Sequence, residues 1–322
     1  MKRLFLGVDA GGTKTTAIIV TADGEVLRHS VGGPANILED GEETVRKSLR
    51  EAVGDILKTY DKVDFSVFGL PVIGEVKGIE DKLSNIISEE LNIKPDLLVN
   101  DVVVGCAGGT GCTDGVHVVA GTGTIAYGRK GSTSVRVGGW GSLADDEGSA
   151  YYIGIETIRE CFRQSDGRKP RTQLIEFVFD SFGLGDIFEL CMWVNTLAEN
   201  ERRNKIAAIA PVTLKSALKG DRSAFEILEK SGVEIAKLAI TGAKRLHLDD
   251  PLITYSGGVL LNNKIVRMSF EKEIEKVIPS ARIRQPLLSP VLGAILLCFE
   301  QNGIPIDANL LNTLKRKDKY DI

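Results

Sequence analysis

Two short loops rich in glycine and threonine carry the residue types best suited to chemistry. The first loop reads Asp-Ala-Gly-Gly-Thr-Lys-Thr at residues 9–15, and the second reads Gly-Thr-Gly-Thr at residues 121–124. Glycine lets backbone N–H groups approach phosphate oxygens without an intervening Cβ, and threonine hydroxyls add hydrogen-bond donors. The neighbouring carboxylate of Asp9 could hold the hydrated magnesium ion that phosphates carry. Together the two loops predict a polyphosphate site.

Each loop lies between two predicted strands, residues 4–9 and 15–21 in the first case and residues 116–120 and 124–129 in the second. A single glycine loop is a weak indication, because ordinary hairpin turns also use glycine. Two loops of this kind predict two similar half-domains that face one another across a cleft, with bare backbone N–H groups on both walls.

Two other nucleotide motifs are excluded by their context. Residues 121–126, Gly-Thr-Gly-Thr-Ile-Ala, fit the dinucleotide pattern G-x-G-x-x-A, but that pattern must open a helix, whereas residues 126–131 indicate strand and turn. Residues 108–112 are dense in glycine, but no G-K-[ST] follows, so they are no P-loop. We interpret residues 108–112 as a flexible connection between domains.

The elements that position these loops form a duplicated α/β unit, because the order of strands and helices restarts after more than 100 residues. Apolar residues at helical spacing predict one amphipathic helix over residues 42–60, and Asp23-Gly24 predicts a hairpin turn. The other predicted elements are strands at 25–31, 65–70, 97–100, 132–137, 252–255 and 281–284, and helices at 79–91, 147–162, within a helical region up to 220, at 224–246 and after 259.

The bulk composition describes a globular chain and excludes some partners. The chain has 322 residues, of which 43% are hydrophobic and 26% charged, enough for two domains with full cores. Its net charge of −4 offers no basic field for nucleic acid, and its longest apolar run, residues 291–299, is too short to span a membrane. The apolar stretch within the first nine residues is too short for the hydrophobic region of a signal peptide, so we expect a cytoplasmic protein. The five cysteines form no CxxC pair and are expected to be reduced, structural thiols.

Four segments in order resemble a known family. The sequence from about residue 4 to 300 resembles the N-acetylglucosamine kinase branch of the BadF/BadG/BcrA/BcrD ATPase family, in the actin, sugar kinase and heat-shock chaperone superfamily. The most specific part is the Gly-Gly-Trp-Gly block with Asp-Glu-Gly-Ser. The segments that carry the resemblance are residues 7–14, 120–124, 138–150 and 256–259.

The resemblance implies an α/β fold of two ribonuclease-H-like (actin-like ATPase) domains flanking an ATP cleft. The N-terminal domain would span residues 1–112 and include the C-terminal helix at about 290–322. The C-terminal domain would span residues 113–289 and contain a helical insertion.

Asp101 follows an apolar strand and precedes a predicted helix. Carboxylates at strand ends do chemistry in many α/β folds, although an aspartate here could also be the helix N-cap. The resemblance matches Asp101 to the catalytic base, which would align a sugar hydroxyl and take its proton while the phosphoryl group transfers.

The resemblance also assigns residues to ATP and magnesium. Asp9 would hold Mg²⁺, and Gly257 with Gly258 would let adenine and ribose approach the helix that follows. Lys14 could touch a phosphate or be a solvated turn residue. The phosphate-binding residues would be Gly11, Gly12, Thr13, Gly121, Thr122 and Gly123.

A second set matches the sugar-contacting positions, Asn36 and Asp146, since a polyol needs short, fixed hydrogen-bond partners. Asp145 and Asp146 precede a predicted helix. We assign Asp146 to the sugar, and Asp145 either to the helix cap or to a supporting contact behind the sugar-binding residues. Trp140, beside Gly139 in the same substrate-binding block, could stack on the sugar or pack beneath its loop.

Two neighbouring residues bear on which sugar is bound. Thr124 could reach the sugar or the γ-phosphate. Ile125 is apolar where this branch often has a polar residue, which leaves recognition of an acetamido group open.

The sequence thus predicts an ATP- and Mg²⁺-dependent kinase that phosphorylates a small-molecule amino sugar, N-acetylglucosamine or glucosamine, at its primary hydroxyl. We expect a homodimer with no nucleic-acid or membrane partner. One alternative is the family's ATPase that activates an acyl-CoA reductase or dehydratase, which needs cysteines for an iron–sulfur cluster, and Cys106 and Cys112 are the nearest pair. Another is a non-catalytic nucleotide switch. The zinc-loop sugar kinases are excluded because the three histidines, His29, His117 and His247, are far apart.

Overall fold

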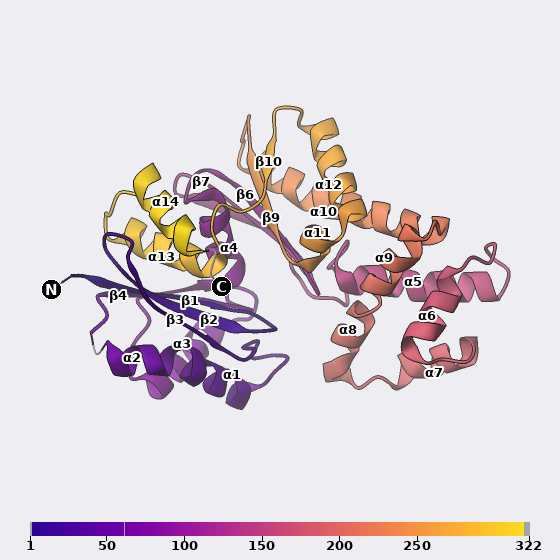
Figure 1. Ribbon diagram of the computed structural model, residues 1–322, viewed down its shortest axis with the longest axis horizontal. Coiled ribbons are helices and arrows are strands. Elements are labelled where there is room, and N and C mark those ends of the chain that lie inside the picture. Colours follow the sequence, from indigo (N-terminus) through magenta and orange to yellow (C-terminus); the bar gives the residue numbers. More distant parts are fainter. Residues whose placement is uncertain (1, 61, 319–322) are drawn as a thin grey trace. The chain divides into compact units, whose positions relative to one another are not determined.

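The computed structural model describes residues 2–60 and 62–318, and the chain divides into two compact units. One unit consists of Met1–His117, Arg129–Gly131 and Arg284–Ile322, and the other of Val118–Gly128 and Ser132–Ile283 (Figure 1). The expected division into functional domains at residues 112/113 and 289/290 stays a prediction.

The first sheet has the strand order β3-β2-β1-β4-β5. Strand β1 pairs antiparallel with β2 and parallel with β4, and β4 pairs parallel with β5. The carboxyl ends of β1, β4 and β5 therefore meet at one edge, where Asp9 is opposite Gly69 and Leu70 is opposite Asn100. The strands are β1 (Leu4–Ala10), β2 (Thr15–Thr21), β3 (Val26–Gly32), β4 (Phe65–Leu70) and β5 (Leu97–Asn100).

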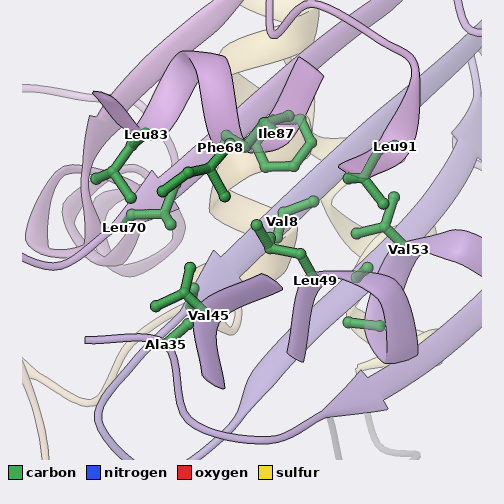
Figure 2. Packing of buried hydrophobic residues seen from close by; sticks show 14 of the residues in the cluster. Val8, Ala35, Val45, Leu49, Val53, Phe68, Leu70, Leu83, Ile87 and Leu91 are labelled. Carbon is green, nitrogen blue, oxygen red and sulfur yellow. The ribbon is translucent and has the colours of Figure 1, made fainter. Parts of the chain in front are cut away.

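Helices cover both faces of this sheet (Figure 1). Because side chains alternate along a strand, Leu6 and Val8 of β1 enter one buried cluster, shown in Figure 2, while Phe5 enters the other. The second cluster takes apolar side chains from α13, whose backbone lies so close to β1 that a Cβ on Gly7 would be 2.8 Å from the carbonyl oxygen of Val291. The covering helices are α1 (Glu42–Leu49), α2 (Asp55–Thr59) and α3 (Ile79–Leu91) on one face, and α4 (Asp101–Thr110), α13 (Pro290–Gln301) and α14 (Ala308–Lys317) on the other.

The single helix expected over residues 42–60 is interrupted by a π-helical segment, Arg50–Gly54, between α1 and α2. This segment packs against β3, where the Ser30 hydroxyl donates to the carbonyl oxygen of Glu51 at 3.2 Å. A Cβ on Gly32 would lie 3.1 Å from the Ala52 nitrogen. Apolar spacing does not distinguish five π-helical residues from α-helix, so the sequence could not reveal the interruption.

The second sheet has the order β10-β9-β6-β7-β8. Taken from its other edge, β8-β7-β6-β9-β10 repeats the order β3-β2-β1-β4-β5 of the first sheet. The expected duplicated α/β fold is therefore confirmed. The strands are β6 (Gly115–Ala120), β7 (Thr124–Lys130), β8 (Thr133–Gly138), β9 (Leu252–Ser256) and β10 (Arg282–Arg284).

The helices after β8 include the expected insertion, which lies between α5 and α10. Helix α5 begins at Ala150 rather than at residue 147, because Ser149 is the N-cap and its hydroxyl accepts a hydrogen bond from the Tyr152 nitrogen at 3.1 Å. Within the described ranges, none of the helices has the length and apolar character needed to cross a membrane. The helices are α5 (Ala150–Ser165), α6 (Leu174–Phe182), α7 (Ile187–Thr196), α8 (Glu199–Ala207), α9 (Ala210–Leu218), α10 (Arg222–Arg245), α11 (Gly258–Asn262) and α12 (Lys264–Val277).

Candidate functional site

The first glycine loop is a closed hairpin turn between β1 and β2. The Gly11 nitrogen donates to the Lys14 carbonyl oxygen at 2.9 Å, and Gly12, Thr13 and Lys14 are exposed. A Cβ added at Gly12 would meet no atom within 4 Å, and its φ lies outside the left-handed region. The fold therefore does not require glycine at residue 12, whereas a ligand that approaches the backbone would.

Asp9 ends the strand that leads into this loop. The pKa of the Asp9 carboxyl is raised to about 7, mainly by burial and also by the charge of Asp101, while the Lys14 ammonium acts to lower it. Asp9 and Asp101 are thus close enough to repel one another at the shared edge of the sheet. Two carboxylates in this relation suit a hydrated divalent cation, which would relieve the repulsion.

Asp101 is the first residue of α4, and it is not the helix cap. Asn100 is the N-cap, and its Oδ1 accepts from the Val102 nitrogen at 3.1 Å. The Asn100 side-chain amide also donates to the Ile73 carbonyl oxygen at 3.0 Å, which ties Asn100 to the loop that follows β4. Asp101 Oδ1 accepts from the Val102 nitrogen at 2.8 Å, which holds the half-buried carboxylate at the strand end. The capping alternative for Asp101 is therefore wrong.

Asn36 lies beside the first loop, because the nitrogen of the preceding Ala35 donates to the Gly11 carbonyl oxygen at 3.0 Å. Its own Oδ1 accepts from the Leu38 nitrogen at 3.1 Å, and its backbone nitrogen donates to Asp40 Oδ2 at 2.8 Å. This local turn orients the side chain and leaves the Nδ2 donor as the atom suited to a ligand hydroxyl.

The second glycine loop is joined to the start of α5. The carbonyl oxygens of Gly121 and Thr122 accept from the nitrogens of Ala150 and Tyr151, at 2.9 and 3.3 Å. These bonds satisfy helix amides that would otherwise have no partner. A Cβ on Gly121 would meet nothing within 4 Å, so at this residue too the fold does not require glycine.

Asp146 is buried directly against this loop. Its Oδ1 accepts from the Thr124 nitrogen at 2.9 Å, and its Oδ2 accepts from Arg203 Nη2 at 2.9 Å. Its backbone is left-handed, with φ of 67°. Burial raises the pKa of the Asp146 carboxyl, whereas the Thr124 N–H group and Arg203 lower it. The Thr124 hydroxyl donates to the Glu147 carbonyl oxygen at 3.1 Å, so its contact with sugar or phosphate stays a prediction.

Arg203 was not predicted from the sequence. It lies in α8 among other charged residues, a pattern typical of a solvent-exposed helix face. Its contact with Asp146 arises only from the tertiary fold. Of the two roles open for Asp145, the helix cap is wrong, because Ser149 caps α5. Asp145 Oδ2 instead accepts from the Trp140 nitrogen at 2.8 Å.

The side chain of Trp140 is not packed beneath its loop, since the residue is 68% exposed. The Arg136 guanidinium stacks on the indole, 4.5 Å from the ring centroid, and donates to the carbonyl oxygens of Gly138 and Gly139. Gly139 has φ of 76°, and a Cβ there would lie 2.8 Å from Ile125 Cδ1. Ile125 thus packs against the loop backbone, which gives a structural reason for an apolar residue.

The two glycines after β9, Gly257 and Gly258, differ in whether the fold requires them. Gly257 has φ of 88°, and a Cβ there would overlap the backbone of Ala120 at the end of β6. A Cβ on Gly258 would approach nothing closer than Asn262 Nδ2 at 3.7 Å. The fold therefore requires the first glycine, and only a ligand would require the second.

The predicted residues thus gather into two groups, one in each unit. Asp9, the first loop, Asn36 and Asp101 belong to the first unit, and the second loop, Asp146 and the Gly257 pair belong to the second. Over residues 2–60 and 62–318, no three His, Cys, Asp or Glu side chains form a set that could hold a metal ion.

The cysteines of the cluster-binding alternative are covered by protein, since Cys106 is buried and Cys112 is partly buried. Burial raises the pKa of both Cys106 and Cys112 to about 12, so neither is poised as a thiolate.

Comparison with known proteins gives consistent matches over most of the chain. The sequence profile of the BadF/BadG/BcrA/BcrD ATPase family matches residues 6–298. N-acetyl-D-glucosamine kinase of Dictyostelium discoideum is 28% identical over 319 residues, covering 92% of this chain and 98% of that protein. N-acetylmuramic acid/N-acetylglucosamine kinase of Clostridium acetobutylicum is 28% identical over 305 residues, with the same coverage of 92% and 98%.

A solved structure supports the fold independently. The structure from Chromobacterium violaceum that is named for N-acetylglucosamine kinase has a TM-score of 0.69 at 23% identity, and the match covers 92% of this chain and 99% of that one. At this identity the match shows the fold alone. It confirms the expected α/β fold, in which this chain has two five-stranded sheets.

Proposed function

This chain belongs to the BadF/BadG/BcrA/BcrD ATPase family, and on that premise we propose that it is an ATP-dependent amino-sugar kinase. The substrate would be N-acetylglucosamine or glucosamine, phosphorylated at the primary hydroxyl. The names of the two curated relatives support this class of substrate. The observation that carries the proposal is Asp101, a carboxylate that is held at a strand end beside Asp9 while Asn100 caps the helix.

Asp101 is proposed to be the general base. Its fixed carboxylate would orient the sugar hydroxyl and accept the proton as that oxygen attacks the γ-phosphorus of ATP. A base of this kind contributes roughly 10²- to 10⁴-fold to the rate.

ATP use follows from the family, and the proposed phosphate contacts are the two glycine loops, at Gly11, Gly12 and Thr13 and at residues 121–123. The Gly11 and Gly121 N–H groups donate within their own loops, so at these two residues the proposal is a close approach of phosphate to a backbone without Cβ. Gly12 and Gly121 support this assignment because the fold itself does not require them to be glycine. Gly258 would allow the nucleoside to approach in the same way, and Lys14 would add a positive charge near the phosphates.

Mg²⁺ is proposed to lie at Asp9. The carboxyls of Asp9 and Asp101 repel one another, which supports a cation at this edge. When bound with ATP, the ion would neutralise phosphate charge during transfer.

The sugar is proposed to contact Asn36, Asp146 and the loop that carries Gly139 and Trp140. The exposed indole of Trp140 offers an apolar face to a sugar ring. Ile125 packs against Gly139 and brings no polar group to an acetamido oxygen, so glucosamine and N-acetylglucosamine both remain in the proposal.

The test is an ADP-release screen over amino sugars and neutral hexoses with Mg²⁺ and ATP. We expect turnover to rise most with N-acetylglucosamine or glucosamine. Retained ATP binding without sugar-dependent ADP release would refute the kinase proposal and favour a nucleotide switch.

We further propose that the protein works in the cytoplasm as a homodimer, without nucleic-acid or membrane partners. The net charge of −4 supports the absence of nucleic acid. Size-exclusion chromatography with light scattering would report the mass, and a monomer at micromolar concentration would refute the dimer.

A further inference from the structure

Helix α8 of the insertion brings one arginine onto the buried carboxylate of Asp146. Arg203 Nη2 and Asp146 Oδ2 are 2.9 Å apart, and the side chains are 29% and 2% exposed. The guanidinium also lies over the second glycine loop, because a Cβ on Gly123 would overlap Arg203 and lie 2.7 Å from Asp146 Oδ1. The loop, the carboxylate and the arginine are therefore in direct contact.

The position of Arg203 is set by helix packing. Helix α8 packs on α5, and a Cβ on Gly154 of α5 would overlap the carbonyl carbon and oxygen of Ile206. Arg203 is three residues before this contact, so it lies about one helical turn away. Helix α5 is in turn bonded through Ala150 to the Gly121 carbonyl oxygen. The packing of α8 on α5 thus places the Arg203 guanidinium beside the second glycine loop.

Asp146 needs such a partner to remain an anion. A buried carboxylate without a compensating charge costs several kcal/mol and takes up a proton instead. Three groups act on its charge: Arg203 of α8 and the Thr124 N–H group of β7 stabilise it, and Asp145 opposes it. Arg203 is the one positive charge among these three.

We propose that Arg203 is a positioning residue of the sugar site, holding Asp146 as a fixed, ionised acceptor for substrate hydroxyls. This inference rests on the proposed amino-sugar kinase function. Its consequence is that the helical insertion takes part in substrate binding through α8, although Arg203 itself need not touch the sugar.

The kinetic test compares Arg203→Met, Arg203→Lys, Asp146→Asn and the double variant Arg203→Met/Asp146→Asn. Arg203→Met should raise KM for the sugar about tenfold or more, the scale of a weakened hydrogen bond to a charged group, with KM for ATP within twofold. In the Asp146→Asn background the same change should add less than twofold, and Arg203→Lys should restore part of the loss. Lys205→Met is the matched control, because Lys205 pairs with Glu201 on the same helix.

A second measurement needs no sugar. Without Arg203 the pKa of the buried Asp146 rises further, and an acid whose folded-state pKa is raised loses stability as pH rises towards that value. Arg203→Met should therefore lower Tm more at pH 8 than at pH 5, and Asp146→Asn should abolish this difference. A purely structural arginine would give a Tm loss independent of pH.

The outcomes separate the two proposals. A wild-type protein without sugar-dependent ADP release would refute the kinase function, while the Tm series would still decide whether Arg203 holds Asp146 ionised. A rise in KM for ATP in place of the sugar would overturn the inference, because Arg203 would then act on phosphate. An equal effect of Arg203→Met with and without Asp146 would overturn it as well.

Discussion

Gly121 offers a sharp test of the phosphate loop, because the fold gives it no reason to be glycine. A Cβ at this residue meets no atom within 4 Å, and the φ value is one that other residues adopt. Gly121→Val should therefore change the free energy of unfolding by about 1 kcal/mol or less, in part because the unfolded chain loses freedom. For a chain of 322 residues that is a Tm shift of roughly 1–2 °C.

ATP binding should respond very differently. A side chain on Gly121 would stand where a phosphate oxygen meets the backbone, and losing one hydrogen bond to a charged group costs about 1.5–3 kcal/mol. This corresponds to roughly a 10- to 100-fold weaker affinity. Isothermal titration of Mg²⁺-ATP into both proteins, with Tm measured on the same preparations, gives both quantities.

Gly185→Val is the matched control, since Gly185 is exposed in the insertion and its φ is also ordinary. It should leave ATP affinity unchanged. If Gly121→Val bound ATP within about twofold of wild type, the loop would be an ordinary turn and the reasoning from unneeded glycines would fail. If the valine variant lost stability, Gly121→Ala would repeat the test with a smaller side chain.

Three further outcomes are expected. Asp101→Asn should keep the fold and ATP affinity while turnover falls by roughly 10²-fold or more, and turnover within threefold of wild type would refute its role as base. The Asp9 carboxyl has its pKa raised from 3.8 to about 7, so this group should cost stability progressively as pH rises from about 4 to 7. When Tm is measured across this pH range without Mg²⁺, Asp9→Asn should not show this loss of stability. If the Tm of Asp9→Asn depended on pH as that of the wild-type protein does, Asp9 would not be the group with the raised pKa. Trp140→Ala should raise KM for the sugar severalfold with Tm unchanged, since the indole is largely exposed, and an unchanged KM would remove Trp140 from the site.

The strands and both loops could be predicted because their signals are local. Alternation along β1 assigns Leu6 and Val8 to one cluster and Phe5 to the other, which is visible in seven residues of sequence. Asp9 and Asp101 could each be predicted as a carboxylate at a strand end, and the observed pairing of β1 with β4 and of β4 with β5 adds that they share one edge of the sheet.

The helix caps could not be predicted because several neighbouring residues suit the same role. Asn100, Asp101, Asp145, Asp146 and Ser149 can all cap a helix, and composition does not say which of them does. The structure assigns the two caps to Asn100 and Ser149, which leaves the aspartates for other contacts.

The role of Arg203 could not be predicted because its contact with Asp146 depends on the tertiary fold. Nothing in residues 199–207 distinguishes one arginine from the next, and only the packing of α8 on α5 selects Arg203. Ile125 was similarly ambiguous, since its packing partner Gly139 is 14 positions away in the chain.

The first unit contains a core that ribosomal synthesis completes late. Phe5, Ile18 and Val67 share a buried cluster with Leu292 and Phe299 of α13. The ribosome makes the second unit between these two parts, about 170 residues that take roughly 9–35 s at ~5–20 residues per second. During that time this face of the first sheet has α4 but lacks α13 and α14, and the apolar side chains that they cover stay exposed. The second unit, continuous except for residues 129–131, can finish folding first, so chaperone dependence in the cell is expected to arise from the N-terminal part of the chain.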